Sequence, residues 1–258
     1  MAIIDEKTQF DPDEIAIPVV GIAAAVGKHD SGMHRHQKGQ LLYAPQGCMH
    51  FALQGSICVL PPSKAVWIPG GVEHRAIMSN VVEYRSLYFD STDFHCLKEI
   101  AMIEVNELLK SLINTMALWP WDKKPEQSHY YTQLFWHEFE QAKRQSFFLP
   151  LPSDKRLTGL LREMNQEDYL LPELNSLAQS VGASSKTLTR LFKTQTGMTY
   201  QEWKQQWRLL KAIQWLCQAR QVTEVAYRLN FSSDSAFIAF FKKQTGMTPL
   251  SFLKSERP

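Results

Sequence analysis

The 258-residue sequence predicts an α+β protein in which a β-rich N-terminal domain with helices precedes an all-helical domain carrying two helix-turn-helix motifs. Three observations predict this order. Short β-rich segments separated by turn residues occupy positions 18–89, and helical periodicity dominates beyond them. A nine-residue segment at 191–199 returns at 240–248 with seven identical positions, which indicates a duplicated supersecondary unit.

The N-terminal domain is expected to be an antiparallel sandwich or barrel, because many short strands follow one another closely. Clusters of proline, glycine and serine at 45–47, 61–63 and 69–71 mark the turns between these strands. The β-rich runs are 19–26, 41–44, 57–60, 65–68 and 81–88.

Helices are expected to follow at 97–118 and 127–144. In the first, an apolar stripe is predicted either to form a seam with a second copy of the chain or to pack on the outside of its own barrel. The stripe consists of Val105, Leu108, Leu109, Leu112 and Met116. The alternating leucines and prolines of 149–152 predict a stiff connector. We therefore divide the chain into an N-terminal domain at 1–148, a linker at 149–156 and a helical domain at 157–258.

Within the helical domain, each copy of the repeat is expected to end a helix-turn-helix. Gly182 and Asn230 stand at the two turns, where a left-handed backbone conformation is required. Gly197 and Gly246 are expected to end the two second helices. A long helix from Tyr200 to about residue 219 is expected to join the two motifs.

The charge of the chain is unevenly divided. Residues 1–152 contain 13 Lys and Arg against 17 Asp and Glu, whereas residues 153–258 contain 15 against 9. The helical domain therefore has the positive balance that a polyanionic partner requires. No long uncharged apolar run predicts a membrane span, and the N-terminus lacks an apolar signal core, so we expect a cytoplasmic protein without a membrane partner.

The segment from Ala226 to Pro249 resembles the signature of the AraC family of bacterial transcription regulators, and the resemblance extends over residues 157–254. It implies two helix-turn-helix motifs joined by one long helix and bound to one face of double-stranded promoter DNA. It further implies a homodimer, and RNA polymerase as a partner at the promoter.

The exposed face of each second helix is predicted to contact DNA. In the first motif an arginine can bond a guanine and lysines can reach bases or phosphates, whereas the second motif offers short side chains beside two lysines. The expected DNA-binding residues are Ser185, Lys186, Thr189, Arg190, Lys193, Ser233, Asp234, Ser235, Lys242 and Lys243.

The N-terminal domain resembles a cupin, the usual sensor domain of that family. His34, His36 and Gly47 fit the first cupin motif, although Gln40 stands where metal-binding cupins have glutamate. The segment from Pro69 to His74 fits the second motif. The resemblance therefore implies a cupin-like β-barrel that binds an effector.

Because His34 and His36 are two residues apart, they are expected to share one face of a strand and to converge with His74 and Gln40. Three imidazoles can bind a divalent transition metal such as zinc, iron, nickel or copper. The alternative is a relict motif, with the histidines hydrogen-bonded to one another, to water or to a small organic effector. Three aromatic residues are expected either to line an effector pocket or to pack in the core, namely Tyr43, Trp67 and Tyr88.

The sequence thus predicts a non-enzymatic, DNA-binding transcription regulator that responds to a small molecule or metal. The alternative is a cupin metalloenzyme, a dioxygenase or isomerase, with a DNA-binding tail. The neutral Gln40 in the carboxylate position argues against this alternative.

Overall fold

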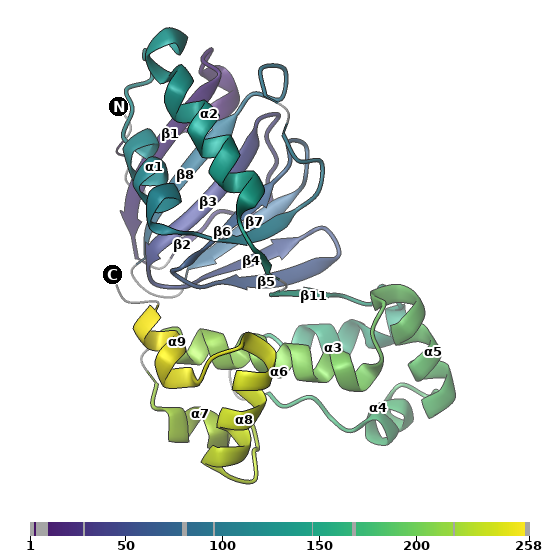
Figure 1. The fold of residues 1–258 in the computed structure, drawn as a ribbon. Helices are drawn as coiled ribbons and strands as arrows, with labels where there is room; N and C mark the ends of the chain where they lie inside the picture. Colours follow the sequence, from purple (N-terminus) through teal and green to yellow (C-terminus); the bar gives the residue numbers. More distant parts are fainter. Residues whose placement is uncertain are drawn as a thin grey trace. The chain divides into compact units, whose positions relative to one another are not determined.

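A computed structural model describes residue 3 and residues 10–27, 29–78, 82–94, 96–145, 147–166, 169–218 and 220–255. The chain divides into two compact units. The first contains residues 1–54 and 59–147 with the last five residues, and the second contains residues 55–58 and 148–253. Strands dominate the first unit and helices the second, which confirms the predicted α+β class (Figure 1).

One sheet of the structure has six strands in the order β1-β8-β3-β6-β9-β10. Its strands pair antiparallel. Every residue of β6 is buried, as are the first six of β3, because both faces of this sheet are covered. The strands are β1 (Val19–Val26), β8 (Val82–Phe89), β3 (Gly39–Gln46), β6 (Lys64–Ile68), β9 (Ala101–Glu104) and β10 (Arg144–Gln145).

The other sheet has five strands in the order β11-β5-β4-β7-β2. In β4 and β7 buried residues alternate with half-buried ones, as expected when one face is covered more fully than the other. The strands are β11 (Phe148–Pro150), β5 (Ser56–Leu60), β4 (Met49–Leu53), β7 (His74–Met78) and β2 (His29–Asp30). The five predicted β-rich runs correspond to β1, β3, β5, β6 and β8, although position 81 lies outside the described residues.

Two helices, α1 (Glu107–Ala117) and α2 (Pro125–Gln141), belong to the first unit. Both helices lie over the six-stranded sheet (Figure 1). Their apolar faces bury a large aromatic and aliphatic cluster with that sheet. Helix α1 passes close to β1 at Gly21, where any Cβ atom would collide with the carbonyl oxygen of Met116. Glycine is therefore required there by the approach of two backbones.

The predicted helix 97–118 is wrong in its first half. Residues Ala101–Glu104 form β9 and pair with β6, since a short apolar run satisfies either period and here a free sheet edge selects the strand. Helix α1 begins only after Asn106, whose side chain accepts a hydrogen bond from the Leu109 N–H at 2.8 Å. Likewise, α2 ends at Gln141 rather than 144, and Arg144–Gln145 form β10.

The apolar stripe on α1 packs mainly within its own unit. Leu109, Leu112 and Met116 are buried in the cluster beneath the helix, so the alternative of a seam with a second copy is wrong for them. Leu108 is 45% exposed and is not part of this cluster.

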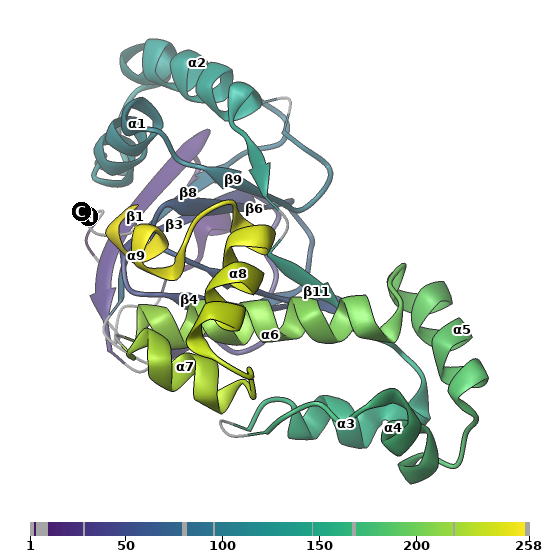
Figure 2. The same cartoon turned by 60° about the horizontal axis from the view of Figure 1, so that its bottom comes forward.

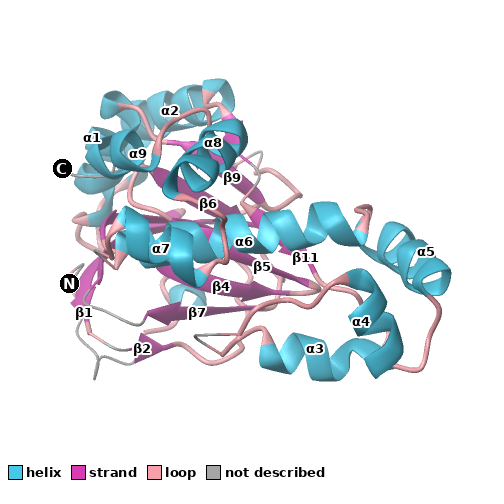
Figure 3. Cartoon of the chain, turned by 90° about the horizontal axis from the view of Figure 1, so that it is seen from below, coloured by secondary structure: helices cyan, strands magenta, loops and turns pink. Residues whose placement is uncertain are grey.

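The second unit is almost entirely helical (Figure 3). Helix α6 joins the two helix-turn-helix motifs, with α4 and α5 toward one end and α7 and α8 toward the other (Figure 2). Among the described residues, no helix has both the length and the apolar character that a membrane span needs. The helices are α3 (Thr158–Glu163), α4 (Leu174–Ser180), α5 (Ser185–Thr196), α6 (Tyr200–Cys217), α7 (Val222–Arg228), α8 (Asp234–Thr245) and α9 (Pro249–Ser255), with 3-10 turns at Pro12–Glu14 and Lys155–Leu157.

The segment expected to be a linker begins as strand β11 and ends in the 3-10 turn at Lys155–Leu157, with hydrogen bonds along its length. Strand β11 pairs with β5, and the Pro150 carbonyl accepts the indole N–H of Trp203 at 2.6 Å. The Gln195 side-chain oxygen then accepts the Ser153 and Asp154 N–H groups at 2.9 and 3.2 Å. These bonds attach the segment to α5 and α6.

Candidate effector site and nucleic-acid interface

Both helix-turn-helix motifs have the turn geometry that the sequence predicts. Gly182 has φ 64° and Asn230 has φ 54°, and Asn230 is the one non-glycine residue with positive φ in the described part of the chain. The hydroxyls of Ser184 and Ser233 cap α5 and α8 by accepting backbone N–H groups at 3.1 Å. Gly197 and Gly246 end the same helices in the left-handed conformation.

The exposed face of α5 carries the long polar side chains expected to read DNA. Lys186, Thr189 and Arg190 are all exposed, while the opposite face is buried. Ser185 is half-buried, and its hydroxyl donates to the Asn175 side chain of α4 at 2.6 Å. Lys193 is exposed and donates to the Gly197 carbonyl at 2.8 Å, so it also caps the helix.

The exposed face of α8 is shorter and less basic. Ser233 is exposed, but its side-chain oxygen is engaged in the helix cap. Asp234 and Ser235 are exposed in the first turn, and Lys242 and Lys243 are exposed in the last. The two motifs therefore present different chemistry to a duplex, the first with long donors and the second with short side chains and flanking charge.

In the first unit, His34, His36 and His74 come together. One ring nitrogen from each lies within 4.8 Å of the other two. His74 begins β7, but His34 and His36 do not share a continuous strand as expected. Instead, His34 makes an isolated bridge with His74, in which each backbone N–H donates to the other's carbonyl at 3.0 and 2.9 Å. This bridge and the following loop bring the rings together.

The Nδ1 atom of each histidine faces a backbone carbonyl. The distances are 3.0 Å from His34 to Gly32, 2.5 Å from His36 to Lys38 and 2.9 Å from His74 to Val72. A neutral imidazole that donates through Nδ1 keeps a lone pair on Nε2. Metal-binding histidines are usually oriented by this kind of bond.

Burial distinguishes the three rings. His74 is 1% exposed, and its Nε2 atom is buried without a hydrogen-bond partner. His36 is 6% exposed, whereas His34 is exposed. Burial lowers the pKa of His74 to about 4 and also lowers the pKa of His36 below its ordinary value. Both buried rings are therefore neutral at pH 7, the form that binds metal.

Gln40 orders the inner side of this cluster. Its amide oxygen lies 3.2 Å from the Nε2 of His36, and its NH2 group donates to the hydroxyls of Ser86 and Tyr88 at 2.8 and 2.9 Å. Turning the amide by 180° would let its nitrogen donate to His36 and its oxygen accept from both hydroxyls. Gln40 can therefore serve a neutral His36 and retain its other partners.

The aromatic residues expected near an effector are separated by the sheet. Tyr88 touches His36, with ring centroids 5.1 Å apart, and it belongs to the site. Tyr43 and Trp67 lie in the cluster beneath α1 and α2, where the indole N–H of Trp67 donates to the Leu97 carbonyl at 2.9 Å. For Tyr43 and Trp67, core packing is therefore the correct alternative. Successive residues of a strand face opposite sides of the sheet, and these two lie on the side opposite to Gln40 and Tyr88.

Sequence reasoning missed two residues around the cluster. Ser86 lies two positions before Tyr88 on β8, so strand alternation alone could have placed both hydroxyls on one face. Lys38 is buried, and its ammonium group donates to the carbonyls of Pro12 and Ile15 at 2.7 and 2.5 Å. Its carbonyl meanwhile faces His36, so Lys38 ties the N-terminal segment to the histidine loop.

Two family descriptions match the chain. "AraC-like ligand binding domain" matches residues 17–161, more than half of the chain, and "Helix-turn-helix domain" matches residues 177–255. The chain therefore belongs to the AraC family of transcriptional regulators. It combines an N-terminal ligand-binding domain with a C-terminal DNA-binding helix-turn-helix domain, as predicted.

A regulator of Escherichia coli K12, the HTH-type transcriptional regulator NimR, is 29% identical over 243 residues, which are 93% of this chain and 89% of NimR. Among solved structures, ToxT from Vibrio cholerae is 10% identical, with 92% of this chain and 98% of that chain covered and a TM-score of 0.38. The DNA-binding domain of AdpA, solved with a target DNA, is 26% identical over 40% of this chain and 93% of that chain, with a TM-score of 0.36.

Proposed function

We propose that the protein regulates transcription in response to an occupant of the site formed by His34, His36, His74 and Gln40. The observation that carries this proposal is the buried Nε2 atom of His74, which has no hydrogen-bond partner and lies beside two further imidazoles. A buried polar atom without a partner costs about 1–3 kcal/mol, and a ligand at this position removes that cost.

A divalent transition metal fits this site. The three histidines would hold it through their Nε2 atoms while their Nδ1 atoms stay bonded to carbonyls, and His36 would exchange its Gln40 contact for the metal. A bound metal would supply positive charge and open coordination positions, where an anionic or oxygen-rich effector could bind.

We propose a binding role rather than catalysis for this site. The Gln40 amide is occupied by His36, Ser86 and Tyr88, and it supplies no carboxylate to act as a metal ligand or general base. The metalloenzyme alternative would need such a group beside the substrate. Site-specific DNA binding would place the protein in the cytoplasm, where the promoters are.

An occupant controls DNA binding only if it prefers one of two states of the chain. The test uses Zn²⁺ as the probe and fluorescence anisotropy of a DNA site selected by the full-length protein. Wild-type affinity should change when Zn²⁺ is added, and a double variant of His36→Ala with His74→Ala should show the metal-free affinity throughout. If the double variant responds as the wild type does, the effector site lies elsewhere.

In the DNA-binding domain, we propose that Arg190 and Lys186 read bases while Lys193, Lys242 and Lys243 contact phosphates. The contrast between the long side chains on α5 and the short ones on α8 supports this division. Arg190→Ala should relax discrimination at one base pair, whereas Lys243→Ala should weaken target and random DNA alike. Equal losses on both DNAs for Arg190→Ala would refute the assignment.

We further propose that the protein acts as a homodimer through an exposed apolar surface on α1 and α2. Leu108, Tyr130 and Leu134 are 45%, 80% and 40% exposed there, and water contact with such side chains is reduced by a second copy. Leu108→Glu with Tyr130→Glu should give a monomer by light scattering. Tyr227→Glu, equally accessible but in the other unit, is the control.

RNA polymerase is the further partner that we propose at the promoter.

A further inference from the structure

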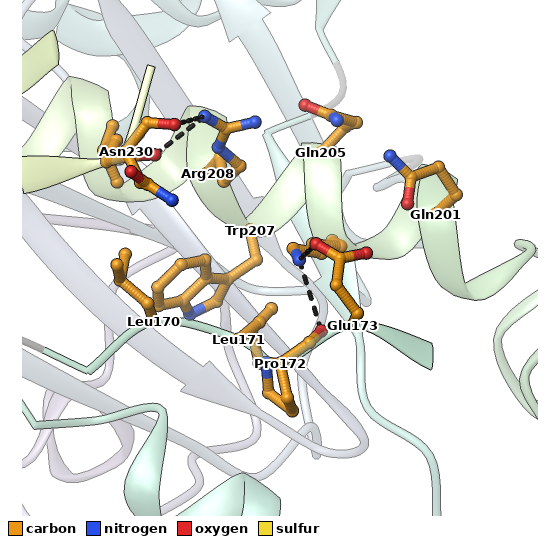
Figure 4. Close-up of a pocket in the computed structure, with 11 residues that line it drawn as sticks. Leu170, Leu171, Pro172, Glu173, Gln201, Gln205, Trp207, Arg208 and Asn230 are labelled. Atoms are coloured by element: carbon orange, nitrogen blue, oxygen red, sulfur yellow. Dashed lines mark hydrogen bonds and ion pairs between the residues drawn. The ribbon is translucent and has the colours of Figure 1, made fainter. Parts of the chain in front are cut away.

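One face of α6 contacts parts of both helix-turn-helix motifs (Figure 4). We propose that Lys204 and Arg208, one turn apart on this face, are positioning residues that fix the separation of the two recognition helices α5 and α8. Through that separation they determine which spacing between two half-sites the protein accepts. This role differs from contact with DNA, because both side chains bond other groups of the protein.

Lys204 holds the start of the first motif. Its ammonium group donates to the Pro172 carbonyl at 3.2 Å and to the Glu173 carboxylate at 2.7 Å. The Tyr200 hydroxyl donates to the same Pro172 carbonyl at 2.7 Å. Since Glu173 is the N-cap of α4, these bonds fix the helix that supports α5.

Arg208 holds the turn of the second motif. Its Nη2 atom donates to the Leu229 carbonyl at 2.7 Å and approaches the Asn230 carbonyl at 3.5 Å. Its guanidinium carbon also lies 3.7 Å from the centroid of the Phe231 ring. Asn230 is the left-handed residue of the turn, and α8 begins four residues later, so Arg208 fixes the backbone that aims α8.

Lys204 and Arg208 both line a pocket of about 360 Å³ beside α6. Trp207 and Leu171 line it with Gln201 and Gln205, and Figure 4 shows Arg208 directed toward Asn230. The contacts of Lys204 and Arg208 beside this open space are therefore local polar bonds. Loss of either set should let one helix-turn-helix motif move relative to the other, while each motif keeps its own core.

The consequence for DNA follows from helical geometry. Two successive major-groove faces are about 34 Å apart, and one added base pair moves the second by about 3.4 Å and turns it by roughly 35°. A rigidly spaced pair of helices cannot follow that displacement without losing contacts at one half-site. A pair of recognition helices with a less rigid separation can follow the displaced half-site, but it binds the preferred spacing more weakly.

The experiment uses full-length protein and a site selected from random duplexes of about 25 base pairs, long enough for two successive major grooves. Hydroxyl-radical footprinting locates the two half-sites, and duplexes with one base pair added or removed between them are compared by anisotropy. Wild-type affinity should fall about tenfold or more on altered spacing. For Arg208→Ala and Arg208→Lys, the ratio of the affinity at the preferred spacing to the affinity at the altered spacing should shrink to about threefold or less. The lysine variant should behave like the alanine variant, because lysine keeps the charge but lacks the planar guanidinium group.

Arg156→Ala is the matched control, because Arg156 is an arginine of the same unit that pairs with Asp154 and lies outside α6. It should keep the wild-type spacing ratio. Should Arg208→Ala lose its helical circular dichroism, Lys204→Met tests the other set of bonds and should also reduce the ratio. An unchanged ratio of affinities in the folded variants would overturn the proposal. A uniform loss of affinity at every spacing, with a smaller salt slope, would also overturn it and would identify these residues as ordinary phosphate contacts.

Discussion

Replacement of Gln40 gives the most direct measure of the proposed histidine site. Gln40 is 4% exposed, and its amide bonds His36 on one side and the hydroxyls of Ser86 and Tyr88 on the other. In Gln40→Ala the His36 ring keeps its Lys38 bond and loses the contact that fixes its inner edge. Two buried hydroxyls also lose a partner, so the wall of the site is less well ordered.

The Gln40 amide oxygen lies 3.2 Å from the Nε2 of His36, the nitrogen that would bind the metal, so it can act as a weak neutral ligand itself. Loss of that ligand should raise the dissociation constant for Zn²⁺ about tenfold, or about 1.4 kcal/mol, in Gln40→Ala, measured by isothermal titration at pH 7. Gln40→Glu should tighten binding instead, since a carboxylate brings charge to the same position.

His137→Ala is the matched control, because His137 is an exposed histidine on α2 outside the cluster. It should bind Zn²⁺ as the wild type does. Equal dissociation constants for wild type, Gln40→Ala and Gln40→Glu would show that Gln40 has no part in metal binding. Equal constants for wild type and His74→Ala would refute the metal site itself.

Four further predictions concern the DNA-binding unit. Arg190→Ala should cost about 1–3 kcal/mol on the selected site, and Lys243→Ala should reduce the salt slope by about one, both measured by anisotropy over a salt series. Asn230→Ala should lower the free energy of unfolding by about 1 kcal/mol in urea titrations while Asn230→Gly should not, because alanine resists the left-handed turn. Thr199→Ala should cost about 1 kcal/mol, since Thr199 and Glu202 form a reciprocal capping box at the start of α6; an unchanged denaturation midpoint would contradict it.

Local signals predicted the helical half of the molecule well. The turn residues Gly182 and Asn230 and the helix ends at Gly197 and Gly246 are all where the repeat places them, since each depends on backbone preferences of single residues. The predicted helix at 97–118 failed in its first half, because Ala101–Glu104 has no clear helical periodicity and pairs with β6 instead. Pairing with the edge of the neighbouring sheet made residues 101–104 a strand rather than a helix.

The family, the two motifs and the identity of the histidines could be predicted from the amino-acid sequence, because these depend on residue types at short spacing. How those residues are used depends on the fold of the whole chain. That fold brought His34 and His36 beside His74 through a backbone bridge, joined Gln40 to Ser86 and Tyr88 across neighbouring strands, and placed Tyr43 and Trp67 in the core beneath the helices. It also brought Lys204 and Arg208 to backbone segments about 20 to 30 positions away. Contacts between distant positions depend on the path of the whole chain, and no local pattern of residues encodes that path.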